Sequence, residues 1–176
     1  MTVRETSKRT AVVPESFFNA LGARLSKDLG SHAAQNVLYE LGRDAGHSFI
    51  AVAEDRLGRR IKTEADYRDL LRLFAEEFGW AHMSLKSIDL PGKHVVVEWW
   101  NGVGVPTRGS PEPVCHLGRG LLSGATEVVF GGSCDAIETQ CQAMGAKRCE
   151  IVVGVPNQIA YLSEEREPGP RRKASR

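Results

Sequence analysis

The sequence has almost no net charge and no long apolar run. Its 23 Lys and Arg residues are balanced by 22 Asp and Glu residues, which leaves a formal net charge of +1. This balance gives no electrostatic reason to expect binding to nucleic acid or to an anionic membrane. No apolar stretch approaches the roughly 20 residues that a membrane-spanning helix requires, so we expect no membrane span.

The N-terminal residues also lack the apolar core of a secretory signal. Arg4, Lys8 and Arg9 are present, but no apolar segment follows them. We therefore expect a cytoplasmic protein. In a reducing cytoplasm the four cysteines are expected to be metal ligands or free thiols rather than disulfides.

Motifs of several enzyme and regulator classes are missing. No Gly-rich dinucleotide loop follows a strand, which argues against an independent reductase. No phosphate-binding loop and no basic recognition helix are present, which argues against a chain that activates transcription by itself. A Cys-x-x-Cys-His motif for haem attachment is also absent. The sequence therefore favours a binding module over an enzyme.

The length of 176 residues suits a single domain. The polar residues 1–12 and the tail, residues 163–176, have too few apolar groups to fold, so we expect disorder there and one domain over residues 13–162. Apolar residues at helical spacing predict a helix between Pro14 and Gly30 and a longer one from its expected cap Ser31 to about residue 57. A third helix is predicted from its cap Thr63 to Gly79.

The pattern then changes from helices to hairpins. Residues 81–90 and 94–100 flank Pro91-Gly92-Lys93, a turn signal, and predict the first hairpin. A Gly-rich helix is predicted over residues 115–130, followed by a hairpin that joins residues 135–142 to 148–155. The predicted class is α+β, with N-terminal helices packed on an antiparallel sheet of hairpins.

Three cysteines lie close together in the C-terminal third. Cys141 and Cys149 fall on opposite arms of the last predicted hairpin, where paired side chains approach within roughly 5 Å. Cys115 begins the preceding helix, and a helix N-terminus favours an ionised thiol. Three thiolates and one further ligand close a tetrahedral zinc site.

The spacing leaves the fourth ligand open. Glu138 precedes Cys141 by three residues, so in a regular strand their side chains would point to opposite faces. A β-bulge, or a turn before the strand starts, would remove this conflict. Cys134 and His116 are equally good candidates by spacing. The alternative is that all four cysteines are small buried apolar residues.

These residues resemble the 4-vinyl reductase domain family. The resemblance rests on Cys115-His116-Leu117-Gly118-Arg119-Gly120-Leu121-Leu122-Ser123-Gly124 and on Glu138-x-x-Cys141-x-Ala-Met-Gly-x-x-x-Cys149. Support upstream comes from Leu38-Tyr39-Glu40-Leu41-Gly42-Arg43-Asp44-Ala45-Gly46 and from Glu98-Trp99-Trp100-Asn101. Members of this family bind small apolar or aromatic molecules, as in the sensor domains of phenol- and xylene-responsive activators. Its wider superfamily includes Golgi vesicle-tethering subunits and haem-based nitric-oxide sensors.

The resemblance implies that zinc is bound by Cys115, Glu138, Cys141 and Cys149, with Cys134 as a plain thiol. Four protein ligands leave no position for water, so the zinc is expected to be structural and to stabilise the C-terminal hairpin. No cysteine set then remains for an iron–sulfur cluster. The family also commonly forms homodimers.

A pocket between helices and sheet is expected to be lined by aromatic and aliphatic groups. The candidates for ligand binding are Phe49, Phe74, Trp80, His82, Trp99 and Phe130. Trp99 falls at the position of the strand tryptophan of the family's sensor pockets, and His82 could hydrogen-bond a phenol or a carboxylate. An aromatic residue is more often part of the core than of a site, so this set is a hypothesis.

Three functions compete. The leading hypothesis is a stand-alone module that binds or senses a small hydrophobic or aromatic molecule and acts through a partner protein or a homodimer. The second is an accessory or carrier protein in the vinyl reduction of a tetrapyrrole, as in bacteriochlorophyll synthesis. The third is a scaffold for protein assembly, like the Golgi relatives.

Overall fold

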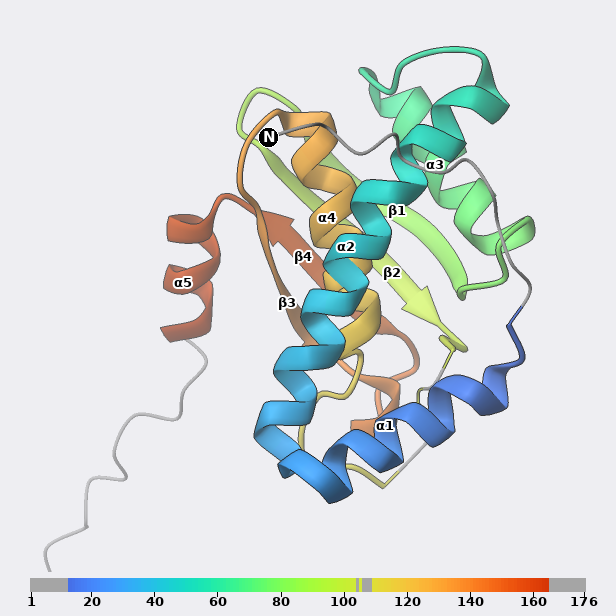
Figure 1. Ribbon diagram of the computed structural model, residues 1–176. Helices are drawn as coiled ribbons and strands as arrows, with labels where there is room; N and C mark the ends of the chain where they lie inside the picture. Colours follow the sequence, from blue (N-terminus) through green and yellow to red (C-terminus); the bar gives the residue numbers. More distant parts are fainter. Residues whose placement is uncertain (1–12, 104, 106–108, 165–176) are drawn as a thin grey trace, which may run out of the picture.

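The computed structural model describes residues 13–103, 105 and 109–164, and the predicted disorder of residues 1–12 and 165–176 lies outside this part of the chain. The fold is α+β, as predicted, with helices on a four-stranded antiparallel sheet (Figure 1). The elements in chain order are α1 (Glu15–Leu29), α2 (Ser31–Leu57), α3 (Glu64–Glu76), β1 (His82–Asp89), β2 (His94–Trp100), α4 (His116–Phe130), β3 (Asp135–Gln140), the 3-10 turn η1 (Gln142–Met144), β4 (Cys149–Gly154) and α5 (Pro156–Glu164). Within the described residues, no helix has the length and apolar character that crossing a membrane requires.

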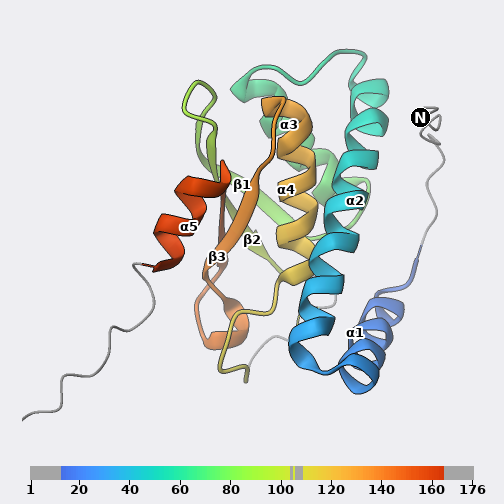
Figure 2. The same cartoon turned by 60° about the vertical axis from the view of Figure 1, so that its left-hand side comes forward.

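The sheet joins the two predicted hairpins in the strand order β1-β2-β4-β3. Antiparallel pairs link β1 to β2, β2 to β4 and β4 to β3. Helices α2 and α4 cover one face, and α5 lies on the other side of the sheet (Figure 2). The predicted alternation in β2 is confirmed, because Val95, Val97 and Trp99 are buried while the residues between them are partly exposed.

Helices α2 and α4 run side by side in the same direction and approach each other through glycines (Figure 1). A Cβ atom on Gly42 would lie 2.1 Å from the carbonyl oxygen of Leu117, and one on Gly120 would lie 1.9 Å from that of Tyr39. Real Cβ atoms essentially never lie closer than 3.0 Å to such neighbouring atoms, and both distances are far below this limit. The backbones therefore meet directly, at four positions that we call the glycine seam: Gly42, Gly46, Gly120 and Gly124.

A carboxylate beside the glycine seam ties the same two helices together. Glu127 of α4 accepts a hydrogen bond from Arg43 Nε at 3.1 Å and lies 2.5 Å from Nε2 of His47, both on α2. It also accepts the backbone N–H of Cys134 at 3.0 Å. Burial alone would raise the pKa of Glu127, but these hydrogen bonds outweigh it and lower the pKa.

The helix ends follow the local sequence, with one difference. Thr63 caps α3 as predicted, and its hydroxyl and the carboxylate of Asp66 form a capping box. Ser31 does not cap α2. Gly30 takes that position, and its φ of 83° lies in the region that glycine adopts without a Cβ penalty. The turn from α1 into α2 is therefore made by the backbone conformation of Gly30, without a side-chain cap.

Helix α5 was not predicted. It begins at Pro156, a residue favoured in the first helical turn, and Ile159 is only 3% exposed where α5 packs against the sheet. Residues 163 and 164, which the sequence placed in the tail, are the last two residues of this helix.

Candidate metal centre and adjoining cavity

Four buried side chains converge between the start of α4 and the last hairpin. Cys115 is the residue just before α4, Glu138 lies in β3, Cys141 follows β3, and Cys149 begins β4. One ligand atom from each lies within 4.8 Å of all the others. The two sulfur atoms of Cys115 and Cys149 are 3.4 Å apart. This group, which we call the Cys3Glu cluster, contains neither Cys134 nor His116.

A β-bulge brings Glu138 and Cys141 to the same side. Glu138 pairs with Ile151 and Gln140 pairs with Glu150, so the register shifts between them and Thr139 is the extra residue. An extra residue reverses the alternation of side chains along a strand. Glu138 is therefore 7% exposed and Cys141 is 2% exposed, both toward the interior.

The donor set and its spacing fit a divalent metal ion. In a tetrahedral zinc site with Zn–S bonds of about 2.3 Å, the ligand atoms lie roughly 3.8 Å apart. The ligand atoms of the Cys3Glu cluster, which all lie within 4.8 Å of one another, are compatible with this spacing. Glu138 Oε2 accepts the backbone N–H of Cys115 at 3.0 Å. Its Oε1 is buried without a hydrogen-bond partner among the described residues. A buried carboxylate oxygen is costly in that state, and a metal ion would satisfy it.

The pKa values of two thiols in the cluster depend on the contact between them. Hydrogen bonds to the Cys141 and Cys149 sulfurs, together with burial, strongly raise the pKa of Cys115. The hydrogen bond from Cys115 lowers the pKa of Cys141 to about 6. Sulfurs this close share their protons, and a cation allows all of them to ionise.

The two other candidates for the fourth ligand, Cys134 and His116, form hydrogen bonds outside the cluster. The thiol of Cys134 donates to the carbonyl of Gly132 at 3.6 Å, and burial raises its pKa to about 11. The ring of His116 accepts at Nδ1 from Arg119 at 2.9 Å. Burial lowers the pKa of His116 to about 4, so its imidazole is neutral near pH 7.

A cavity of about 350 Å³ adjoins the Cys3Glu cluster. It lies between α1, the first half of α2, the start of α4 and the segment that leads into α4. Its lining is mostly apolar: Phe18, Asn19, Gly22, Ala23, Ser26, Leu38, Val103, Val105, Val114, Cys115, Leu117 and Gly118. Of the predicted site residues, only Cys115 is among them, because the cavity depends on how α1 docks and periodicity does not show that.

Three of the six predicted ligand-binding residues do come together, but as a packed cluster. The ring of Phe49 lies 5.8 Å from that of Phe74 and 5.7 Å from that of Trp80. Phe18 and Phe78 complete this group at 5.6 Å from Trp80 and 4.8 Å from Phe49, respectively. Phe18 also lines the cavity, so the cluster supports one of its walls.

Trp99 lies next to the cavity rather than in the aromatic cluster. It is 1% exposed, and its indole occupies the space that side chains on Gly102 and Gly118 would need. Gly118 lines the cavity. The indole Nε1 is buried and has no hydrogen-bond partner among the residues that the structure describes.

The other two predicted residues lie apart from the cavity. His82 is exposed on the opposite face of the sheet and stacks on Trp100 at 5.6 Å. Its orientation follows from strand alternation, since Met83 and Leu85 take the inward positions of β1. Phe130 is a core residue, 8% exposed, at the far end of α4.

The sequence of residues 96–155 matches the family model of the V4R domain. The match spans 60 of the 176 residues of the chain. The match contains the whole Cys3Glu cluster and Trp99. An uncharacterised protein of Methanocaldococcus jannaschii is 23% identical over 154 residues, which cover 85% of this chain and 80% of that relative. A second one from this organism is 29% identical over 98 residues, which cover 54% of this chain and 59% of the relative.

Several solved structures share the fold of this chain. The phenol-responsive sensory domain of the transcription activator PoxR, solved with phenol, has a TM-score of 0.71 at 19% identity, covering 88% of this chain and 83% of that one. A trafficking protein particle complex subunit 3 from Naegleria fowleri, covalently bound to palmitic acid, has a TM-score of 0.63 at 16% identity, with coverages of 80% and 91%. A vinyl-4-reductase family protein from Methanocaldococcus jannaschii has a TM-score of 0.51 at 16% identity, with 83% of each chain covered.

Proposed function

We propose that this chain binds or senses a small hydrophobic or aromatic molecule in the cavity beside α1. A structural zinc ion in the Cys3Glu cluster would fix the position of the start of α4, which borders the cavity. The molecule would exert its effect through a partner protein or a second copy of the chain. The observation that carries the proposal is the indole N–H of Trp99, which is buried and unpartnered beside the cavity.

A buried donor without an acceptor destabilises a fold by about 1–3 kcal/mol. A ligand with one oxygen, such as a phenol, would supply the acceptor, while its ring would contact the apolar lining. The cavity volume of about 350 Å³ is near the lower end of ligand pockets, which measure roughly 300–1,000 Å³. This size favours a molecule with one or two rings over a tetrapyrrole.

The two similar folds with the highest TM-scores given above support a ligand-binding role. PoxR's sensory domain was solved with phenol, and the Naegleria fowleri subunit carries palmitic acid. Both ligands are largely apolar and have few polar atoms. The cavity of this chain has a similar balance, with Asn19 and Ser26 among mainly apolar residues.

Zinc in the Cys3Glu cluster would be structural. Three thiolates and one carboxylate fill a tetrahedral shell and leave no position for a reacting water. The residues of the cluster would join the start of α4 to both strands of the last hairpin. Cys115 belongs to the cluster and also lines the cavity, so the metal would fix the part of α4 that a ligand touches.

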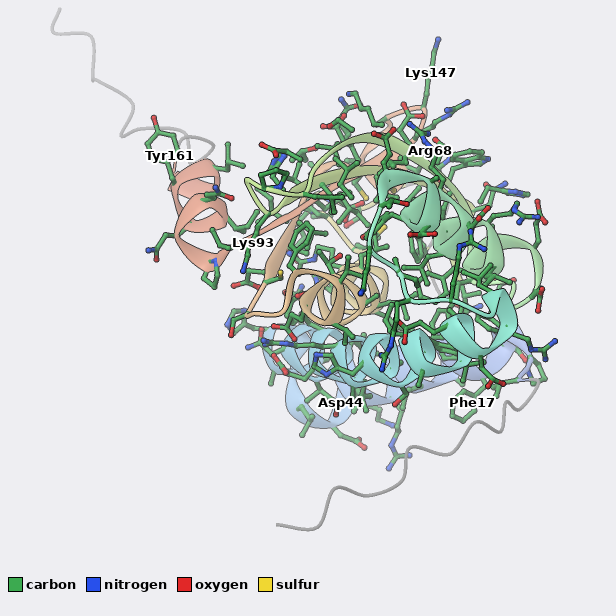
Figure 3. The ribbon with its side chains drawn as sticks, turned by 90° about the horizontal axis from the view of Figure 1, so that it is seen from above. Phe17, Asp44, Arg68, Lys93, Lys147 and Tyr161 are labelled. Atoms are coloured by element: carbon green, nitrogen blue, oxygen red, sulfur yellow. The ribbon has the colours of Figure 1, made fainter. Side chains whose placement is uncertain are left out.

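A homodimer through α1 is part of the proposal. No residue of α1 is buried, and Phe17 and Leu29 are 53% and 52% exposed. Figure 3 shows Phe17 at the periphery of the molecule. Leu41 of α2 is also 45% exposed. We expect a dimer in light-scattering measurements, and a monomer for Phe17→Ser combined with Leu29→Ser; a wild-type monomer would refute this element.

The decisive test compares phenol with toluene, which differs in having a methyl group instead of the hydroxyl. Calorimetric titration of the wild-type protein should detect phenol binding. Trp99→Phe keeps an aromatic ring but removes the N–H, so it should weaken phenol binding by about threefold to tenfold and leave toluene binding nearly unchanged. Trp100→Phe, on the outer face of the sheet, is the matched control and should change neither.

Two results would count against the proposal. If neither compound binds the wild-type protein, the cavity is not a site for small aromatic molecules. If Trp99→Phe weakens phenol and toluene equally, the indole N–H does not contact the ligand. Native mass spectrometry of the same samples gives the metal content, and one zinc ion per chain is expected.

A further inference from the structure

The Cys3Glu cluster brings the sulfurs of Cys115 and Cys149 close enough for a second kind of chemistry. Sγ of Cys115 and Sγ of Cys149 are 3.4 Å apart, while the ligand atoms of the whole cluster spread to 4.8 Å. A disulfide bond measures about 2.05 Å. The two sulfurs therefore need to approach by only about 1.4 Å, which side-chain rotation and small backbone shifts supply.

Cys115 is also the cysteine that small molecules can reach. It lines the cavity beside α1, whereas Cys134, Cys141 and Cys149 do not. The cavity extends to the surface, because Asn19, Ala23 and Ser26 on its α1 wall are exposed. A hydroperoxide is small enough to follow this path. A bound metal ion would ionise all the thiols of the cluster alike, so access decides which of them reacts first.

We propose that the Cys3Glu cluster is an oxidation site, at which a hydroperoxide joins Cys115 to Cys149 and displaces the metal. The Cys115 thiolate attacks one peroxide oxygen, the O–O bond breaks, and hydroxide or alkoxide leaves with a proton from solvent. The Cys149 thiolate then attacks the resulting sulfenic sulfur, and the S–S bond forms as hydroxide leaves and is protonated. The peroxide takes up two electrons, and the two sulfurs lose them.

Disulfide formation would affect the cavity through the last hairpin. With two of its four ligands removed, the cluster would no longer bind metal tightly, and Cys141 would lose its connection to α4. Cys141 precedes the η1 turn, where Gln142 accepts the backbone N–H of Asn101 and Ala143 accepts that of Ser110, both at 3.0 Å. Val103 and Val105, which lie between Asn101 and Ser110 in the sequence, line the cavity wall. Oxidation would therefore loosen this wall and weaken ligand binding.

The inference rests on the proposed metal site and goes beyond the proposed binding of a ligand. The test uses the full-length, zinc-loaded protein and hydrogen peroxide as the probe. A chromogenic chelator reports zinc release, and mass spectrometry of non-reduced peptides locates disulfides. We expect zinc release to parallel the formation of one disulfide, between Cys115 and Cys149, and both to be reversed by dithiothreitol with added zinc.

Two variants sharpen the assignment. Cys134→Ser removes the cysteine outside the cluster and should release zinc within about twofold of the wild-type rate. Cys149→Ser should form no disulfide at Cys115, and dimedone should trap a sulfenic acid there. If Cys149→Ser does not fold, the peptide map of the wild-type protein decides alone.

Several results would overturn the oxidation site. They are a disulfide that links Cys141 to Cys149, a disulfide that includes Cys134, and overoxidation of Cys115 without any disulfide. A protein that takes up no zinc would refute the metal site itself. A protein that holds zinc but never forms the Cys115–Cys149 bond would refute the oxidation site alone.

Discussion

Replacing Gly120 by alanine adds a single methyl group at the closest point of the glycine seam. The new Cβ atom would lie 1.9 Å from the carbonyl oxygen of Tyr39 and 2.8 Å from the backbone nitrogen of Arg43. Both obstacles are backbone atoms of α2, so no side-chain rotation relieves the contact. Helices α2 and α4 must separate instead, and both lie against the core.

The expected loss of stability follows from two opposing effects. Alanine is the better helix former by about 1 kcal/mol. An ordinary van der Waals contact begins near 3.4 Å, so the two helices must move apart by about 1.5 Å. Usual overpacking of a core costs about 1–3 kcal/mol, and the cost of this displacement should be at least as large. We expect Gly120→Ala to lower the free energy of unfolding by about 2–4 kcal/mol. For a chain of this size, this corresponds to a decrease in Tm of roughly 5–15 °C.

Gly22→Ala is the matched control because it makes the same substitution in α1. Its Cβ atom would meet only Leu38 Cδ1, at 4.0 Å, so the gain in helix propensity of up to about 1 kcal/mol should remain. Urea unfolding of both variants, followed by circular dichroism, measures the difference. If Gly120→Ala were as stable as the wild-type protein or as Gly22→Ala, the close backbone contact of α2 and α4 would be refuted.

Three further changes have defined outcomes. Removing metal with a strong chelator should lower the Tm, and an unchanged melting curve would contradict a structural metal. Glu127→Gln should lower stability by about 1–3 kcal/mol, since Arg43 and His47 lose their charged partner; urea unfolding checks this, and an unchanged midpoint would contradict it. The hydrogen bond from Arg59 lowers the pKa of Asp66 in the fold, so this carboxylate stabilises the protein above its unfolded pKa of about 4 and loses the effect as the pH falls further. The stability difference between Asp66→Asn and the wild-type protein should therefore shrink from pH 7 to pH 3, and a constant difference would refute the assignment.

Much of the fold was predictable because local patterns determine it. Thr63 shows a cap in the sequence, and the alternation from Val95 to Trp99 shows one buried face of a strand. The spacing of the candidate metal ligands left the fourth one open among Glu138, Cys134 and His116, and only the resemblance to a family selected Glu138. A bulge or a turn was needed for Glu138 and Cys141 to face the same side, and the structure contains a bulge between Glu138 and Gln140.

The cavity could not be predicted, because it is made by packing between distant segments. Phe18, Leu38 and Val105 show only helical or loop patterns, and nothing in their spacing indicates that they face one space. The residues named for the predicted pocket were five aromatic residues and His82, and three of them, Phe49, Phe74 and Trp80, pack against one another. His82 illustrates a signal that was available: Met83 and Leu85 are apolar at alternate positions, which assigns His82 to the outer face of β1.

The positions of the cluster residues along the chain bear on when a metal ion could bind during folding. Cys115 and Cys149 are 34 residues apart, and Cys115 and Glu138 are 23 apart. Closing loops of this length is entropically unfavourable without other contacts, so the unfolded chain offers no preformed site. The helix α4 and the last hairpin must dock before three sulfurs and a carboxylate can meet. Uptake of the proposed zinc ion would therefore be a late event in folding, and zinc-sensitive fluorescence should develop only after the helical and sheet signals have appeared.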